Sequence, residues 1–392
     1  MNLLYSEVED DLRSAVRSVL ADRCGAAAVL ARVEGKEPYD PALWRVLAAE
    51  LGLAGLLVSE ALGGQGASAR EVAVVLEELG AAAAPVPFLG SAVLATSALL
   101  GCHTADGAVA GLLGRLASGE QTAALAVPLA ATPGGGFPEA VLADAEGRLT
   151  GRVTSVADAF AADVLVVPAI GPEGPGLYEV AAADVLVERF TSLDLTRPLS
   201  DVAFGGAPGR LLAAADATAT LDRALLTGAG LLASEQLGVA QWCLDETVRY
   251  LGERHQFGRV VGSFQSLKHR LADLWLEVVS ARAAARAAAD ALAAWGADDS
   301  SAGSVDGSSA GSFDSPAATE ARIAVAVAQS YTAGVAVHAA EEAVQLHGGI
   351  GMTWEHPAHL YLKRAKADEI ALGTPGRHRA ALGALVDLTA AR

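Results

Sequence analysis

The stretch YLGERHQFGRVVGSFQSLKHRLADL, residues 250–274, decides how the C-terminal half of this chain is interpreted. Within it, RHQFGR interrupts two runs with helical spacing, and FQSLKH begins the second run. Arg254 and Gln256 are planar groups with several donors, which suits phosphate and amide recognition. The same residues would also serve as a solvated turn between two helices. Taken alone, the stretch predicts two helices joined by a turn and leaves its function open.

A second stretch, QLHGGIGMTWEHP (345–357), is a glycine-rich turn between two further helical runs. Gly348, Gly349 and Gly351 permit close approach of a ligand or partner, or simply a tight turn between helices. The turn is not a GxGxxG after a strand, so a Rossmann dinucleotide site is not supported. The sequence also contains no P-loop and no GxSxG. His347 lies in no metal-ligand spacing such as HExxH, and it is interpreted as an ordinary polar or core histidine.

The hydrophobic pattern divides the chain into three parts. Residues 1–118 show helical spacing, residues 119–215 carry short apolar runs between turns, and residues 216–392 return to long helical runs. Within the last part, residues 296–319 are rich in Ser, Gly and Asp and are expected to form a mobile surface loop. The order predicts an α+β protein with an N-terminal helical domain, a middle β-domain and a C-terminal helical domain.

Composition narrows the possible partners. The net charge of the 392-residue chain is −18, which argues against nucleic acid or an anionic membrane as the main partner. The alanine-rich runs are broken by charges, so no transmembrane helix is expected. Three widely separated cysteines indicate neither a disulfide framework nor a zinc site. The chain is therefore expected to be cytoplasmic.

Together these segments resemble the acyl-CoA dehydrogenase family along nearly the whole chain. Residues 50–80 are similar to its N-terminal segment, and residues 147–169 and 194–204 are similar to its middle β-domain. Residues 250–273 and 345–374 are similar to its two C-terminal signatures. The resemblance implies a C-terminal four-helix bundle and FAD as cofactor. It also implies desaturation of an acyl-CoA thioester to the trans-2-enoyl-CoA, with an electron-transfer flavoprotein or similar acceptor taking the electrons.

The resemblance assigns FAD contacts to both C-terminal signatures and to the turn that ends the second. The residues at these positions are Arg254, Gln256, Phe257, Gln265, Gln345, Gly348, Gly349 and Thr374. In the family the two signatures reach the FAD of a neighbouring subunit, whereas the position of Thr374 touches the ADP half of the flavin. An oligomer built from dimers, usually a tetramer, is therefore implied.

The sequence departs from the family at the flavin ring and at the catalytic base. The loop AVPLAATPGGGFPEA (126–140) lacks the usual Thr-Glu-Pro and Gly-Ser-Asp-like elements, and no WxT flavin-stacking element is found. Most members carry their catalytic glutamate directly before the Gly-Thr turn, where this chain has Leu372. A minority carry it on the helix before the first signature, where this chain has Gly228. The backbone N–H of Leu372 is still expected to hold the thioester oxygen.

Glu235 is the remaining candidate for the base. It lies on the helical face of Gly228, two turns further along, which corresponds to a displacement of about 10 Å. It stands in an otherwise apolar run, where a lone glutamate tends to be partnered or to have a raised pKa. It is either a relocated base or a buried structural carboxylate.

Two hypotheses of function follow. The chain is a catalytic acyl-CoA dehydrogenase with an unusual base, or it is a non-catalytic partner subunit that completes the FAD site of a catalytic chain in a mixed tetramer. Such mixed tetramers occur in the family in actinobacteria that degrade steroid side chains. Other flavin-dependent oxidation chemistry is a third possibility.

Overall fold

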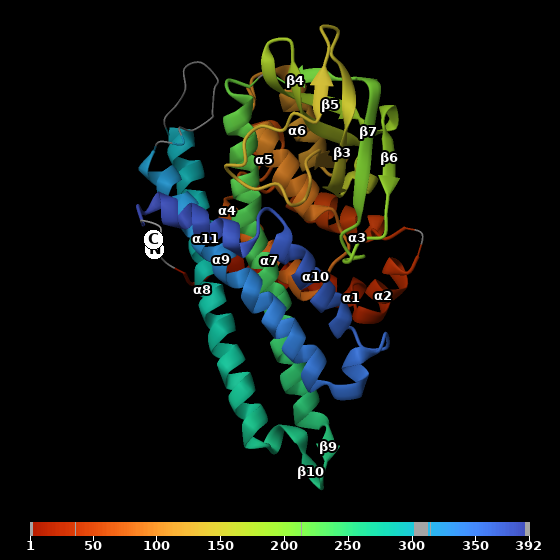
Figure 1. Ribbon diagram of the computed structural model, residues 1–392, viewed down its shortest axis with the longest axis vertical. Helices are drawn as coiled ribbons and strands as arrows, with labels where there is room; N and C mark the ends of the chain where they lie inside the picture. The colour runs from red at the N-terminus through yellow and green to blue at the C-terminus, as the bar shows by residue number, and fades with distance from the viewer. Residues whose placement is uncertain (1–2, 36, 213, 302–312, 314, 389–392) are drawn as a thin grey trace.

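The computed structural model describes residues 3–35, 37–212, 214–301, 313 and 315–388. The sheet lies at one end of the molecule with the N-terminal helices beside and below it, and the long C-terminal helices extend to the other end (Figure 1). The chain passes through helices, then strands, then helices. This order confirms the predicted α+β class.

The N-terminal part consists of short helices with well-defined beginnings. Ser6 and Ser68 each accept a backbone hydrogen bond from the first helical turn, and Glu9 and Glu71 complete the capping boxes. Such reciprocal caps fix where a helix begins. The α-helices are α1 (Glu7–Arg23), α2 (Ala26–Val33), α3 (Pro41–Arg45), α4 (Ala69–Ala81), α5 (Thr96–Leu100) and α6 (Gly107–Ala117). The 3-10 and π-type helices are η1 (Val46–Glu50), η2 (Leu53–Gly55), η3 (Glu60–Leu62) and η4 (Phe88–Ala95).

The middle part is one eight-stranded sheet with the order β6-β7-β3-β2-β4-β5-β8, and β1 pairs with β4. Most neighbouring strands are antiparallel, whereas β4 runs parallel to β1 and β2. Along β7, Ser200, Val202 and Phe204 are buried at alternate positions, as a half-buried strand requires. The strands are β1 (Ala123–Leu125), β2 (Val141–Ala143), β3 (Arg148–Ala157), β4 (Val164–Gly171), β5 (Gly174–Ala181), β6 (Leu186–Arg189), β7 (Leu199–Pro208) and β8 (Arg210–Leu212).

The C-terminal part is a bundle of long helices, and a small hairpin closes its far end (Figure 1). Asp216 caps α7 by accepting hydrogen bonds from the backbone of Thr218 and Ala219. The helices are α7 (Ala217–Glu253), α8 (Gln265–Ser301), α9 (Pro316–Leu346), α10 (Ala358–Ile370) and α11 (Pro375–Leu385). The hairpin strands are β9 (His255–Gln256) and β10 (Arg259–Val260), followed by the 3-10 turn η7 (Val261–Ser263), and η8 (Gly348–Met352) follows α9.

The tract 296–319, expected to be a loop, is helical at both ends. Helix α8 continues to Ser301, and α9 begins at Pro316 behind the cap of Ser315. An alanine-rich helix extends through an occasional Gly or Asp because each costs only about 1 kcal/mol or less. Residues 302–312 and 314 lie outside the described residues. The proposed domain boundaries, 118/119 and 215/216, fall between elements and stay a prediction.

Helix α9 is the one described helix that is long and apolar enough to cross a membrane. In its apolar window 61% of the residues are buried inside the molecule. Helices α7, α8, α10 and α11 all contact it. This environment is the one expected for the central helix of a bundle.

Candidate functional site

The turn after α10, where the family carries its usual base, lies in the interior. Leu372 is fully buried and has a φ of 54°, a left-handed conformation that few residues other than glycine adopt. Its N–H donates a hydrogen bond of 2.7 Å to the carbonyl oxygen of Leu129. The expectation that this N–H holds a thioester oxygen is therefore corrected, because a carbonyl of the chain already accepts it. Thr374 is exposed and its hydroxyl caps α11.

The two positions at which the family carries its base are neighbours in space. A Cβ placed on Gly228 would lie 3.1 Å from Cδ1 of Leu372 and 2.4 Å from Cδ2 of Leu94 on η4. Leucine side chains therefore fill the space between α7, η4 and the turn. A carboxylate at either position would have to displace them.

The loop that follows β1 packs directly on the same turn. Arg377 donates a 3.0 Å hydrogen bond to the hydroxyl of Thr132, and the N–H of Gly134 donates to Asp222 on α7. A Cβ on Gly373 would lie 2.8 Å from Cγ2 of Thr132. The family resemblance assigns flavin contacts to both segments, yet here they contact each other. The two segments are therefore in direct contact where Thr132 meets Gly373 and Arg377.

Glu235 is fully buried between two arginines. Nη2 of Arg197 donates to both carboxylate oxygens at 2.6 Å, and Arg364 on α10 donates to Oε1 as well. Burial alone would raise the pKa of Glu235, but the two guanidinium charges outweigh it, and the pKa lies below its ordinary value. An ionised carboxylate held this way is a weak proton acceptor. The geometry supports the structural alternative for Glu235.

The same cluster joins the sheet to the bundle. Arg364 donates a 2.5 Å hydrogen bond to Asp194, and Arg197 donates one of 2.5 Å to Asp368. Asp194 and Arg197 belong to the β6–β7 connection, whereas Asp368 lies on α10. Burial raises the pKa of Asp368 to about 7, a shift that Arg197 opposes and Glu235 reinforces. No spacing pattern in the sequence connects the segments that carry these charges, so the cluster could not be predicted.

Four of the predicted FAD-binding residues lie at the exposed end of the bundle, in and beside the β9–β10 hairpin (Figure 1). Phe257 is 90% exposed and has a φ of 54°. Arg254, Gln256 and Gln265 are exposed as well. Exposed aromatic and multi-donor side chains of this kind favour contact with another molecule.

Three more predicted residues, Gln345, Gly348 and Gly349, are exposed at the end of α9 and in η8. The ring of Tyr250, near the end of α7, stacks on His347 with 4.4 Å between centroids. This stacking brings the two sequence signatures to one region of the molecule, although they are far apart in the chain.

A cavity of about 500 Å³ lies between α4, α5, α7 and α8. Thr227, the residue before Gly228, lines it together with Arg223, whose guanidinium lies 4.4 Å from the ring centroid of Trp295. This volume falls within the range of small-molecule sites. Gly228 itself faces Leu94 and Leu372, which do not line the cavity, so the cavity lies on a different face of α7. It is the candidate space for an acyl group.

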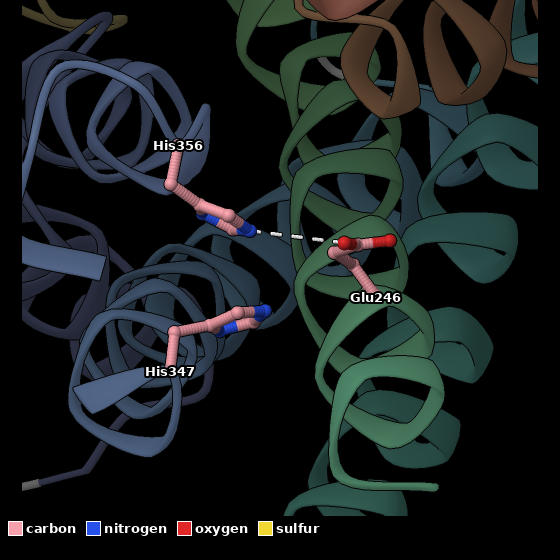
Figure 2. A group of neighbouring side chains, drawn as sticks. All are labelled: Glu246, His347 and His356. Atoms are coloured by element: carbon pink, nitrogen blue, oxygen red, sulfur yellow. Dashed lines mark ion pairs between the residues drawn. The ribbon is translucent and has the colours of Figure 1, made fainter. Parts of the chain in front are cut away.

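A second cluster missed from the sequence consists of Glu246, His347 and His356, whose side chains converge from three segments (Figure 2). His347 is only 2% exposed, in agreement with its interpretation as a core histidine. The three residues show no ligand spacing because only the packing of α7 against the end of α9 and the start of α10 assembles them.

Two family models match the chain. "Acyl-CoA dehydrogenase, N-terminal domain" matches residues 6–120, and "Acyl-CoA dehydrogenase, C-terminal domain" matches residues 218–386. The chain is 34% identical to acyl-CoA dehydrogenase IpdE2 of Mycolicibacterium smegmatis over 371 residues, covering 94% of this chain and 96% of the relative.

Solved structures agree in fold. The ChsE4-ChsE5 complex from Mycobacterium tuberculosis matches with a TM-score of 0.81 and 28% identity, over 100% of both chains. A variant of the Tcur3481-Tcur3483 steroid ACAD matches with a TM-score of 0.79 and 28% identity, over 97% of this chain and 98% of that chain. By two matching models and a relative similar along nearly its full length, this chain belongs to the acyl-CoA dehydrogenase family.

Proposed function

We propose that this chain takes part in the FAD-dependent desaturation of an acyl-CoA thioester to the trans-2-enoyl-CoA. The observation that carries the proposal is membership of the acyl-CoA dehydrogenase family along nearly the whole chain. In such a reaction FAD, when bound, accepts the hydride, and an electron-transfer flavoprotein or similar acceptor reoxidises it. The working form would be a cytoplasmic tetramer.

The exposed end of the bundle supports a role toward a neighbour's FAD. Arg254, Gln256 and Phe257 are exposed beyond the end of α7, and Tyr250 near that end stacks on His347, which directly precedes Gly348. A guanidinium and backbone N–H groups in a glycine turn are the donors that a pyrophosphate requires. These residues therefore fit the half of an FAD site that one subunit supplies to another.

A non-catalytic partner subunit is the second candidate role, and the surroundings of Leu372 favour it. The Leu372 N–H is bonded to Leu129, the positions of both known bases are filled by apolar packing, and Glu235 is paired with two arginines. The chain would then supply the exposed bundle end, and a second kind of chain would supply the base and flavin-ring contacts. One structural neighbour is itself described as a ChsE4-ChsE5 complex.

The substrate class we propose is a bulky acyl-CoA such as a steroid-derived thioester. Support comes from the cavity of about 500 Å³ between α4, α5, α7 and α8 and from the neighbour described as a steroid ACAD. A cavity of this size is large enough for a ring-containing acyl group, whereas a two- or three-carbon chain would fill only part of it.

Expression of the chain alone and with candidate partner chains tests both roles. A colourless lone chain that gains flavin and acyl-CoA-dependent bleaching only on co-expression would establish the partner role and exclude self-sufficiency. A yellow lone chain whose flavin is bleached by acyl-CoA would exclude the partner role. Flavin that no acyl-CoA bleaches in any assembly would overturn the desaturation proposal itself.

A further inference from the structure

Three side chains with metal-ligating atoms meet beside the glycine-rich turn (Figure 2). Glu246 comes from α7, His347 caps the end of α9, and His356 precedes α10. One ligating atom from each lies within 4.8 Å of the others, and Nε2 of His356 lies 3.7 Å from Oε1 of Glu246. Ligands of a tetrahedral Zn²⁺ are about 3.4 Å apart, so small side-chain rotations would close the site.

One hydrogen bond of the His347 ring leaves its other nitrogen available to bind a metal ion. Its Nδ1 lies 2.6 Å from the carbonyl oxygen of Ala343, so Nδ1 carries the proton and Nε2 presents a lone pair. That Nε2 is buried and, among the described residues, has no hydrogen-bond partner. A buried unpaired acceptor is costly unless something binds it. A histidine whose second nitrogen donates to a carbonyl is the usual arrangement at metal sites.

The other two residues complete the donor set. Arg249 donates to both oxygens of Glu246, at 2.5 and 2.9 Å, which holds the carboxylate in one orientation. Arg249 also pairs with Glu253 at 2.7 Å, so part of its charge is balanced. Nδ1 of His356 accepts the N–H of Ala358 at 3.2 Å, and binding through Nε2 would move the ring proton to Nδ1 and release that N–H. Metal binding therefore costs one hydrogen bond at His356.

A cavity lies beside the carboxylate of the cluster, and burial disfavours the charged form of both imidazoles. A cavity of about 320 Å³ between α1, α4 and α7 reaches Glu246. Burial lowers the pKa of His347, and burial together with His347 lowers that of His356. Neutral imidazole is the form that binds a metal.

We propose that Glu246, His347 and His356 bind one divalent transition-metal cation such as Zn²⁺, with water in the fourth position. Two imidazoles and one carboxylate are a common ligand set for borderline metals, whereas Mg²⁺ and Ca²⁺ prefer oxygen ligands alone. The bound ion would tie η8, which follows His347 directly, to α7. Its role is to fix the turn that carries Gly348 and Gly349.

The test measures Zn²⁺ and Co²⁺ binding by the full-length chain, in the assembly in which it purifies. The chain is first dialysed against chelator and then titrated calorimetrically with Zn²⁺. We expect one Zn²⁺ per chain, a melting temperature that rises with Zn²⁺ concentration, and visible Co²⁺ absorption bands typical of a low-coordinate nitrogen and oxygen site. Glu246→Gln and His356→Gln should each weaken binding by about tenfold or more.

The matched control is His338→Gln. His338 is a surface histidine on α9 with Nδ1 2.8 Å from Glu277 and Nε2 4.0 Å from Glu342, so it resembles the cluster in composition but is exposed. The His338→Gln variant should bind Zn²⁺ as tightly as the unmodified chain does. Absence of Zn²⁺ binding and of Co²⁺ bands in the unmodified chain would overturn the proposal, even if the cluster variants failed to fold. Equal binding by Glu246→Gln and the unmodified chain, or an equal loss in His338→Gln, would also overturn it.

Discussion

Glu235 shows how a single residue can have two opposite interpretations until its partners are known. In sequence it is a lone carboxylate in an apolar run, near the position of the minority base. In the structure Arg197 and Arg364 surround it, and its pKa falls below the ordinary value because their charges outweigh the effect of burial. No residue pattern around position 235 reveals those arginines, since one is on the β6–β7 connection and the other on α10.

Replacement of Glu235 by Gln tests the structural role. Removing one member of a buried ion-pair cluster leaves its partners uncompensated, and Glu235→Gln should lower the free energy of unfolding by about 3–5 kcal/mol. Turnover per bound FAD in the folded assembly should stay near that of the unmodified protein. Urea unfolding and steady-state kinetics check the two parts.

Glu341→Gln is the control, because Glu341 pairs with Lys366 at the surface and should change stability by about 1 kcal/mol or less. Loss of turnover in Glu235→Gln with unchanged stability and FAD content would identify Glu235 as a base instead.

Asp368 makes a pH-dependent contribution to stability. Its pKa is raised from 3.8 to about 7, so the folded chain binds this proton more tightly than the unfolded chain. The stabilisation is complete below pH 3.8 and is lost as the pH rises through 7. The melting temperature of the unmodified chain relative to Asp368→Asn should therefore fall between pH 4 and 7.

Scanning calorimetry of both proteins over this range measures the effect. Buried histidines with lowered pKa values, such as His347 and His378, give the opposite slope in both proteins and cancel in the comparison. A difference that is flat or rises with pH would contradict the raised pKa.

At the scale of elements, the long helices can be predicted from apolar spacing, whereas the close contact between the backbones of two helices cannot. Helices α4 and α7 touch at two glycines. A Cβ on Gly80 would lie 2.1 Å from the carbonyl oxygen of Glu235, and one on Gly238 would lie 1.9 Å from that of Glu77. The sequence shows glycines within helical runs, but only the structure shows their role, which is to let the backbones of α4 and α7 touch where the helices cross. The helical ends of the tract 296–319 were not predicted, because its Ser, Gly and Asp content indicates a loop although Ser315 caps α9 within it.

Gly80→Ala tests the helix crossing. The added methyl would meet backbone rather than a flexible side chain, so the variant should lose about 1–3 kcal/mol of unfolding free energy. In α9, Gly334 has open space around its missing Cβ. Gly334→Ala should therefore gain up to about 1 kcal/mol from helix propensity. Chemical denaturation compares the two, and equal effects would show that the backbones are not in close contact.

For the whole molecule, the sequence identified the family and the fold class, because the signatures are long and stand in the expected order along the chain. It did not reveal that the loop after β1 closes on the turn at Leu372, since Thr132 and Arg377 form no motif. The residues that can contact other chains lie exposed at the surface. Phe257, at 90% exposure, is far from any core in the chain as described.

Phe257→Ser tests whether this end is an assembly surface. We expect subunit association to weaken by about tenfold or more, as for an aromatic anchor, and FAD content to fall with it. The melting temperature of the dissociated chain should not change. Leu142→Ser, at a 57% exposed position of the sheet, is the control and should leave association intact. Sedimentation velocity measures the association of the subunits. Unaltered association in Phe257→Ser would exclude this end of the bundle as an assembly surface.

The leucine packing around Gly228 also bears on how this chain can evolve. A glutamate at position 372 would enter a fully buried site, and one at position 228 would collide with Leu94 and Leu372. A carboxylate at either position would therefore need a smaller neighbour as well, since either change alone would cost stability. The packing thus couples Leu94, Gly228 and Leu372, so that a larger side chain at one of these positions is tolerated only together with a compensating change at another.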